Sequence, residues 1–262
     1  MAVESIAALA VTALTSIPDA GGTPAWRVLA YDTVGSTNDV AAQLSPWQVV
    51  LAASQTQGRG RRGRSWVADR GGIWLSAVLP TPAPAERWSV LPLAAGWALR
   101  ETLASFGVAG TRLRWPNDLM VGRAKLAGIL VERFRPDTAV IGLGLNYTNE
   151  PAVADASLAG AVVRLADLAK PLPSREEVLA TLLAHFALAQ RRIEENRVAA
   201  MLPALNAAWH VGRVLVTLQG AKEPLAGTFL GVTELGCLRF ADDAGATLEL
   251  IPSQVELLRE IG

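Results

Sequence analysis

The sequence predicts an α+β protein of two domains, a larger one over residues 1–210 and a smaller one over residues 211–262. Up to residue 210, short apolar runs typical of buried strands are interspersed with longer segments whose apolar residues recur at helical spacing. From residue 211 onward, short strands of period-two alternation are separated by Gly and Asp turns, which favours a small antiparallel barrel. With 262 residues, 51% of them hydrophobic, the chain can bury a sizeable core.

The charge balance and the cysteine and histidine counts limit the chemistry. Lys plus Arg and Asp plus Glu are each 24, so the chain lacks the broad basic surplus typical of proteins that hold duplex DNA. The single cysteine, Cys237, excludes an internal disulfide and a CxxC metal site, suits a reducing cytosol, and is interpreted as a small buried apolar side chain. We expect both histidines, His185 and His210, to be structural, which leaves no histidine-based metal site or catalytic triad.

Residues 1–17 have an apolar centre, and we expect a short amphipathic helix there. The segment carries Glu4 and has no positive N-terminal region, so it does not fit a secretory signal. A membrane span needs roughly 20 apolar residues, and this stretch falls short of that before Pro18. We therefore expect a cytoplasmic protein with no membrane partner.

Residues 26–31 predict the first strand of the larger domain. It leads into Ser36, Thr37 and Asn38, which stand where a strand gives way to a helix. Short polar side chains at such a junction either cap the helix or offer hydroxyls and amides to a ligand, and the local sequence leaves both readings open.

A basic loop lies between two predicted buried strands, residues 49–54 and 73–79. Residues 55–69, called here the arginine loop, read QTQGRGRRGRSWVAD. Glycines permit unusual backbone conformations, guanidinium groups match carboxylate and phosphate oxygens, and a tryptophan offers a flat face for stacking. This pattern indicates a loop that closes over an anionic ligand. A flexible basic surface loop and a nucleic-acid contact are the alternatives.

The next segments predict a helix over residues 86–106 and then a hairpin over residues 112–132. Pro116 interrupts the hairpin, and Asn117 and Asp118 favour a turn there. Lys125 begins an otherwise apolar strand, where an ammonium group directed inward needs a negative partner; the alternative is a lysine whose head group extends to the surface.

The remaining elements complete the two domains. Residues 139–147 predict a buried strand that ends near Asn146, residues 175–196 a helix with Glu176 and Glu177 in its first turn, and residues 201–209 a short helix. Four strands follow in the smaller domain, over residues 213–219, 225–233, 237–243 and 246–252.

Four segments in this order together resemble the biotin protein ligase family: STN at 36–38, SQTQGRGRRGRSW at 54–66, RWPNDLMVGRAKLAGIL at 114–130 and GLGLN at 142–146. The resemblance covers roughly residues 26–262. It implies a mixed, largely antiparallel sheet backed by helices, related to class II aminoacyl-tRNA synthetases and lipoate ligases, followed by an SH3-like barrel. It also implies that biotin and MgATP give biotinyl-5′-AMP and pyrophosphate, and that a lysine of a biotin carboxyl carrier domain of a carboxylase then takes the biotinyl group.

The resemblance further implies roles for particular residues. Lys125 stabilises charge during adenylation, and Arg61, also counted as catalytic, lines the biotin and phosphate site together with Arg59. Asp118, the third catalytic candidate, orients the acceptor lysine or eases its deprotonation. Asn117, Asp118 and Asn146 are candidates for the phosphates and for magnesium, which we expect to arrive with ATP and not at a tight protein site. Gly128 and Leu130 form a wall of the biotin pocket, and Trp66 packs on the ligand, with adenine as the expected partner. The remaining ligand-binding positions are Ser36, Thr37, Asn38, Gln55, Gly58, Arg59, Gly60 and Arg64.

The resemblance also bears on partners and alternatives. Some members carry an N-terminal winged helix and repress transcription, but only 25 residues precede Trp26, so we expect a ligase without that domain and without operator DNA. We expect a monomer or a weak, ligand-linked homodimer. We also expect the empty arginine loop to be mobile and to close on the adenylate. The competing functions are a lipoate or octanoate ligase and a non-catalytic nucleic-acid module, which would bind with steep salt dependence.

Overall fold

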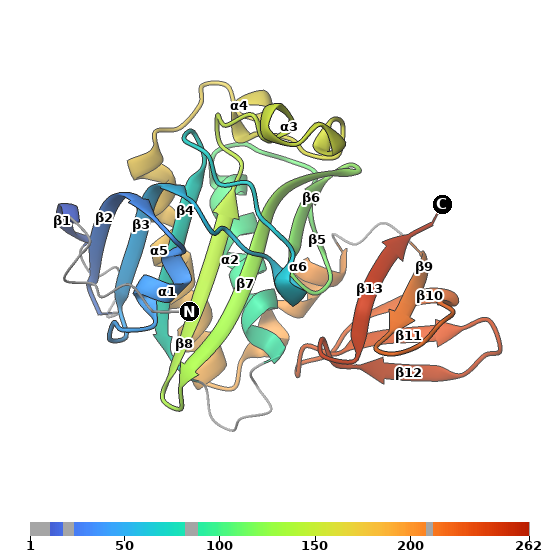
Figure 1. The fold of residues 1–262 in the computed structure, drawn as a ribbon. Coiled ribbons are helices and arrows are strands. Elements are labelled where there is room, and N and C mark those ends of the chain that lie inside the picture. The colour runs from blue at the N-terminus through green and yellow to red at the C-terminus, as the bar shows by residue number, and fades with distance from the viewer. Residues whose placement is uncertain (1–10, 18–23, 82–88, 208–211, 262) are drawn as a thin grey trace.

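The computed structural model describes residues 11–17, 24–81, 89–207 and 212–261. These residues form an eight-stranded sheet with its helices and a five-stranded sheet beside it (Figure 1). The predicted domain boundary near Val211 and the expected position of His210 lie outside the described residues.

The larger sheet has the strand order β1-β2-β3-β4-β8-β7-β6-β5. Only β2 and β3 pair in parallel, and the other neighbours are antiparallel, which confirms the mixed, largely antiparallel prediction. The predicted hairpin interrupted at Pro116 is present as β5, β6 and β7. The strands are β1 Val11–Ile17, β2 Trp26–Val34, β3 Gln48–Gln55, β4 Ile73–Pro80, β5 Thr111–Arg114, β6 Asp118–Val121, β7 Ala124–Arg135 and β8 Thr138–Leu145.

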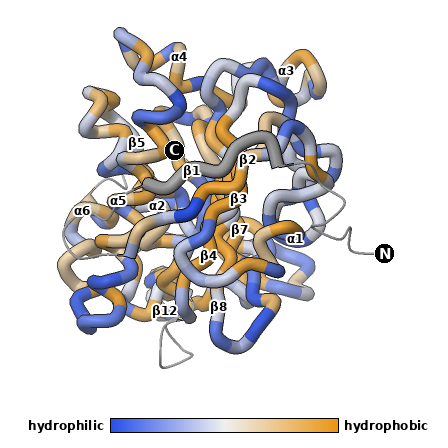
Figure 2. The backbone as a smooth tube through the Cα atoms, turned by 90° about the vertical axis from the view of Figure 1, so that its left-hand side faces the viewer, coloured by the Kyte–Doolittle hydropathy of each residue, from blue (hydrophilic) through white to orange (hydrophobic). Residues whose placement is uncertain are grey.

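Helices cover both faces of this sheet. Adjacent strand residues point to opposite faces, so Val49 packs into the main core with α2 and α5, whereas Val50 packs into a second core beneath α1. In Figure 1, α2 and α5 lie behind the sheet and α1 in front of it, and Figure 2 shows that the strands between these layers are coloured as hydrophobic. The helices are α1 Thr37–Ala41, α2 Leu91–Ser105, α3 Pro151–Ala154, α4 Leu165–Leu168, α5 Arg175–Glu194 and α6 Leu202–Ala207.

The predicted helices of the larger domain are confirmed with shifted ends. The helix expected over residues 86–106 is described from Leu91, with Pro92 in its first turn, and residues 82–88 lie outside the described chain. The first turn of α5 carries Glu176 and Glu177, as predicted. His185 on α5 has its Nδ1 3.0 Å from the hydroxyl of Thr102, which is a structural contact between α2 and α5.

The N-terminal prediction is wrong for the part that is described. Residues 11–17 form β1, an edge strand that pairs antiparallel with β2, where we expected a helix; residues 1–10 lie outside the described chain. β-Branched residues at Val11, Thr12, Thr15 and Ile17 disfavour a helix, and the free edge of β2 offers backbone partners. No helix in the described ranges is long and apolar enough to cross a membrane.

The smaller sheet is antiparallel, with the order β12-β11-β10-β9-β13. Four of its strands were predicted, and the fifth, β13, was not, because Ser253 and Gln254 before it carry no strong turn signal. Closure of the sheet into an SH3-like barrel stays a prediction. The strands are β9 Arg213–Leu218, β10 Leu225–Val232, β11 Leu238–Asp242, β12 Thr247–Leu250 and β13 Val255–Glu260.

The smaller sheet is fixed to the larger part by buried polar contacts. Arg112 of β5 forms a salt bridge with Glu260 of β13, and the two side chains are only 6% and 13% exposed. The indole N–H of Trp115 donates to the carbonyl of Gly236 at 3.0 Å. Apolar residues of both sheets belong to one continuous core, so the two parts pack as one body.

Candidate functional site

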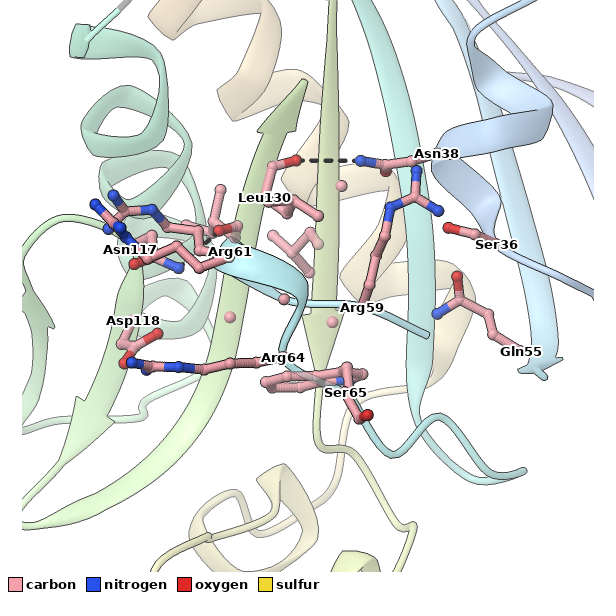
Figure 3. A pocket seen from close by; sticks show the side chains of 18 of the residues that line it. Ser36, Asn38, Gln55, Arg59, Arg61, Arg64, Ser65, Asn117, Asp118 and Leu130 are labelled. Atoms are coloured by element: carbon pink, nitrogen blue, oxygen red, sulfur yellow. Dashed lines mark hydrogen bonds between the residues drawn. The ribbon is translucent and has the colours of Figure 1, made fainter. Parts of the chain in front are cut away.

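The site is a cavity between the arginine loop and the larger sheet, at the start of α1 and beside the β5–β6 turn. Figure 3 shows Ser36, Asn38 and Gln55 on one side of it, and Asn117 and Asp118 on the other. Fourteen of the positions predicted from the sequence line it: Ser36, Thr37, Asn38, Gln55, Arg59, Gly60, Arg61, Arg64, Trp66, Asn117, Asp118, Lys125, Gly128 and Leu130.

Two predicted positions, Gly58 and Asn146, are not among the lining residues. An added Cβ at Gly58 would lie 2.4 Å from the carbonyl oxygen of Trp66, so this glycine permits the two sides of the loop to approach. Asn146 is 1% exposed and donates from Nδ2 to the carbonyl of Lys125 at 3.3 Å. The structure therefore places Asn146 beneath the backbone of Lys125, where it supports that residue.

One end of the cavity, called here the neutral end, presents hydroxyl and amide groups, with the ion-paired Arg59 beside them. Both the backbone N–H and the hydroxyl of Thr37 donate to Gln55 Oε1, at 2.8 and 3.0 Å. Ser76 Oγ lies 2.7 Å from Thr37 Oγ1 and 2.5 Å from Asn38 Oδ1. Ser36 is the N-cap residue of α1, but its side chain makes no capping hydrogen bond. The start of α1 therefore faces the cavity with uncharged groups whose positions are fixed by one another.

Arg59 joins the arginine loop to this end of the cavity. Its guanidinium forms salt bridges with Asp39 of α1 at 2.6 Å and Glu132 of β7 at 2.9 Å. Asn38 Nδ2 also donates to Glu132, at 2.6 Å. The hydrogen bonds that Arg59 donates to Asp39 and its contacts with Glu132 raise the pKa of Arg59 despite its partial burial. Because two carboxylates already hold Arg59, it fixes the base of the loop in this structure.

The opposite side, called here the charged end, is organised by Asp118. Lys125 Nζ lies 2.6 Å from one carboxylate oxygen of Asp118, and Arg114 Nη2 lies 2.6 Å from the other. Burial raises the pKa of Asp118, but the positive charges of Lys125 and Arg114 outweigh it, so that the net pKa is below its usual value. Asn117 is fixed beside them because its Nδ2 donates to the carbonyl of Ile129 at 2.9 Å. The inward lysine predicted to need a negative partner therefore has one.

Between the two ends, glycines provide a flat surface for Trp66. An added Cβ would lie 2.9 Å from the indole ring at Gly128 of β7 and 2.7 Å from it at Gly144 of β8. The Lys125 ammonium lies 4.9 Å from the centre of the same ring. The indole N–H of Trp66 is buried without a hydrogen-bond partner. A side chain larger than hydrogen at either glycine would displace the tryptophan.

The tip of the arginine loop is a tight turn, Arg61–Gly63. Its sides are joined by hydrogen bonds from Gly60 N to Arg64 O at 2.6 Å and from Trp66 N to Gly58 O at 2.9 Å. Burial and the neighbouring Arg62 and Arg64 lower the pKa of Arg61, and Asp118 partly opposes this shift. Positive charges are therefore concentrated above the charged end.

Comparisons with protein families, known proteins and solved structures each find biotin or lipoate ligases. Residues 32–146 match the model of the biotin/lipoate A/B protein ligase family. A biotin–[acetyl-CoA-carboxylase] ligase of Paracoccus denitrificans is 30% identical over 239 residues, which are 83% of this chain and 95% of that protein. The chain belongs to this family. A ligase of the same name from Mycobacterium tuberculosis is 38% identical over 175 residues, which are 62% of this chain and 64% of that protein, less than two thirds of its length.

The chain also shares its fold with a solved structure. The biotin protein ligase from Aquifex aeolicus in complex with biotin and ATP has a TM-score of 0.77 and 24% identity, covering 89% of this chain and 99% of that one. The mixed α+β architecture predicted from the sequence is thereby confirmed.

Several lining residues of this family member were not identified from the sequence: Arg62, Ser65, Ile129, Gly142, Leu143, Gly144 and Glu256. Gly142 and Gly144 lie in the GLGLN segment, and the alternation of glycine there is a signal that something packs closely on that strand. At Gly142 an added Cβ would lie 2.3 Å from Asn38 Oδ1. Glu256 gives no local signal, because only the fold brings β13 to the cavity.

The carboxylates of the site do not form a metal-binding group. Within the described ranges, no three His, Cys, Asp or Glu side chains are placed to hold one ion. Both oxygens of Asp118 are occupied by cationic partners, and Glu132 is bound by Arg59 and Asn38.

Proposed function

We propose that the protein is an ATP-dependent biotin protein ligase. It activates biotin to biotinyl-5′-AMP with release of pyrophosphate, and then transfers the biotinyl group to a lysine of a carboxylase's biotin carboxyl carrier domain. The observation that carries the proposal is the two-ended cavity, with hydroxyl and amide groups at one end and paired charges at the other. Biotin has a matching pair of ends, a neutral ureido group that donates and accepts hydrogen bonds and a carboxylate.

The neutral end favours biotin over lipoate. The dithiolane ring of lipoate offers no strong hydrogen-bond donor or acceptor, so it would give no partner to a buried group such as the Ser36 hydroxyl, which makes no capping hydrogen bond. A site built to hydrogen-bond its substrate discriminates strongly against an analogue that lacks those groups. Ser36, Thr37, Asn38 and Gln55 are therefore assigned to the ureido end of biotin, and Gly128 and Leu130 to the wall beside it.

The charged end supports adenylation. Attack of the biotin carboxylate on the α-phosphorus of ATP brings two anions together, and fixed positive charge stabilises the added negative charge of the transition state. Lys125 is held by Asp118 and lies beside Trp66, so its ammonium is in place before substrates bind. Arg61 and Arg64 supply further positive charge from the loop, and the loop covers the mixed anhydride against water. Trp66 and Asn117 are assigned to the adenylate.

Asp118 is assigned an orienting role in the transfer step. A carboxylate with a lowered pKa is a weak base, so it removes a proton from an ammonium group poorly. It can still position the acceptor lysine by charge, as it positions Lys125. The acceptor amine attacks the acyl carbon of biotinyl-5′-AMP, the bond to the phosphate oxygen breaks, AMP leaves, and the amine proton passes to solvent.

The proposed function includes Mg²⁺ as the companion of ATP. Mg²⁺ enters with the phosphates of ATP, since the site has no free carboxylate cluster to hold it. The protein acts in the cytoplasm, binds no nucleic acid, and is a monomer or a weak ligand-linked homodimer. Its domains divide at about residue 211, with catalysis in residues 1–210.

The test is pyrophosphate release from ATP in the presence of biotin or lipoate. Release with biotin alone, and its loss in Lys125→Ala, is the expected result. Release that follows lipoate would overturn the substrate assignment and leave the fold untouched. Release with neither acid would overturn the ligase assignment, and the arginine loop would then be tested for salt-dependent nucleic-acid binding.

A further inference from the structure

The tip of the arginine loop is bonded to the smaller sheet. Arg61 Nη2 donates to the carbonyl of Pro252 at 2.7 Å. Arg62 Nη2 donates to the carbonyls of Ser253 and Val255, both at 3.1 Å. Pro252 and Ser253 lie in the connection between β12 and β13, and Val255 begins β13, about 190 residues from the loop in sequence. This contact joins a loop over the cavity to a part of the chain that the sequence motifs do not include.

The connection that accepts these bonds is itself fixed. Gln254 N donates to Ile251 O at 3.0 Å and Gln219 N to Gln254 O at 2.8 Å, which ties the connection to the end of β9. The sheet is in turn held on the larger part by the Arg112–Glu260 salt bridge and the hydrogen bond from Trp115 to Gly236. A side chain that bonds to this connection is therefore attached to a rigid support.

Arg61 and Arg62 differ in what they can do. Both line the cavity, but Arg61 is half-buried and interacts with Asp118, so an anion in the cavity competes with Pro252 for its guanidinium. Arg62 is exposed and donates to two carbonyls at once. Its backbone is left-handed, with φ 59°, and Gly63 follows at φ 70°. Such a φ is unfavourable for a residue with a Cβ, and the two hydrogen bonds fix Arg62 in it.

We propose that Arg62 is a positioning residue that holds the arginine loop on the smaller sheet while Arg61 turns from Pro252 to the anionic ligand. This inference rests on the proposed function, because the ligand that the loop retains is the acyl-adenylate. Arg62 touches no reacting atom in this arrangement. Its loss should shorten the retention of the intermediate, because the loop is then no longer held on the smaller sheet.

The test compares Arg62→Ala, Arg62→Lys and the control Arg70→Ala. Arg70 flanks the same loop, is exposed, and pairs with Asp32, not with the smaller sheet. The first readout is the dissociation rate of a non-hydrolysable sulfamoyl analogue of biotinyl-5′-AMP. We expect about tenfold faster dissociation from Arg62→Ala, the order expected when a charged donor loses its partners, and a dissociation rate equal to that of wild type from Arg70→Ala. Arg62→Lys should remain impaired, because an ammonium group lacks the planar fork that serves two acceptors.

The second readout is amide hydrogen exchange without ligand. In Arg62→Ala, exchange should increase in residues 58–66 and 251–256 and stay unchanged in β2. A dissociation rate and exchange pattern equal to those of Arg70→Ala would overturn the proposal. Full recovery of slow dissociation in Arg62→Lys would also overturn it, since charge alone would then explain the effect.

The two proposals fail in distinguishable ways. If wild type does not bind the adenylate analogue, the ligase function is wrong, and hydrogen exchange still decides whether Arg62 holds the loop on the smaller sheet. If wild type binds the analogue and releases pyrophosphate but Arg62→Ala behaves as Arg70→Ala does, only the role of Arg62 is wrong.

Discussion

The two ends of the cavity are built in different ways. At the neutral end, Thr37, Gln55 and Ser76 are held by hydrogen bonds between uncharged groups. At the charged end, Asp118 holds Lys125 and Arg114 by charge. Neutral hydrogen bonds discriminate between substrates because a missing partner leaves a buried group unpaired, whereas fixed charge acts most strongly where new charge develops. The comparison predicts that the neutral end sets affinity and the charged end sets the rate.

The largest effect is expected at the charged end. Lys125→Ala should lower kcat for pyrophosphate release on the order of 100–1,000-fold, as removal of a fixed electrostatic donor does in other enzymes. The substitution removes one of the two cations bound to Asp118 and leaves Arg114. Lys125→Arg retains the positive charge at position 125 and is therefore the control. Steady-state kinetics with saturating biotin and ATP measure the effect. A change confined to the KM for biotin would contradict the division between the two ends.

The next effect is expected at the neutral end. Gln55→Leu removes the acceptor of both Thr37 hydrogen bonds and should weaken biotin binding about 10–100-fold, with kcat changed far less. Gln57→Leu, at an exposed position of the same segment, is the matched control and should bind as wild type. Titration of biotin gives both affinities. Equal losses of biotin affinity in the two variants would show that the affinity depends on the segment as a whole and not on the Thr37–Gln55 hydrogen bonds.

A smaller effect is expected between the two ends. Gly144→Ala places a methyl group 2.7 Å from the indole nitrogen of Trp66, and the tryptophan must move off the strand. Overpacking of this kind costs about 1–3 kcal/mol, and because Trp66 is assigned to the adenylate, affinity for the sulfamoyl analogue of biotinyl-5′-AMP should fall by roughly tenfold or somewhat more. At Gly212 an added Cβ meets nothing within 4 Å, which makes Gly212→Ala the control. If both variants bind the analogue equally well, Trp66 does not need the flat surface.

The smallest effect is expected from pH. The folded pKa of Asp118 is below its usual value, so its stabilising charge is fully present above an unfolded pKa of about 3.9 and is lost as pH falls through the lower folded pKa. Between about pH 5 and 8, the pH–rate profile of biotin transfer should therefore show no rise or fall caused by titration of Asp118. Comparison with Asp118→Asn measures this. An acidic limb in that range that disappears in the variant would make Asp118 a general base.

The same comparison shows what could be predicted from the sequence. Ser36, Thr37 and Gln55, and likewise Asp118 and Lys125, lie in short segments with local signals such as a helix start, an interrupted strand or a charged residue in an apolar run. Glu132, Ser76 and Glu256 have no such signal, because their positions depend on the pairing of β7 with β8, of β4 with β8, and on the docking of β13. Residues 11–17 were predicted as a helix from their apolar pattern alone, and the structure shows that the edge of the next strand, β2, pairs with them instead.

The arginine loop shows the limit of local reasoning within one segment. Its arginines predicted an anion site, but their partners differ. Arg59 is held by Asp39 and Glu132, Arg62 by the smaller sheet, and Arg61 lines the cavity near Asp118. Which arginine faces the ligand depends on long-range contacts that no short motif contains. Whether the loop becomes ordered only with the adenylate stays a prediction.

The most direct test of the central claim is calorimetric titration of biotin without ATP into wild type, Gln55→Leu and Lys125→Ala. If the neutral end sets affinity, Gln55→Leu loses at least about tenfold in affinity and Lys125→Ala stays within about threefold of wild type. If Lys125→Ala loses more affinity than Gln55→Leu, the charged end binds the ground state of the substrate, and the assignment of affinity and rate to separate ends is wrong.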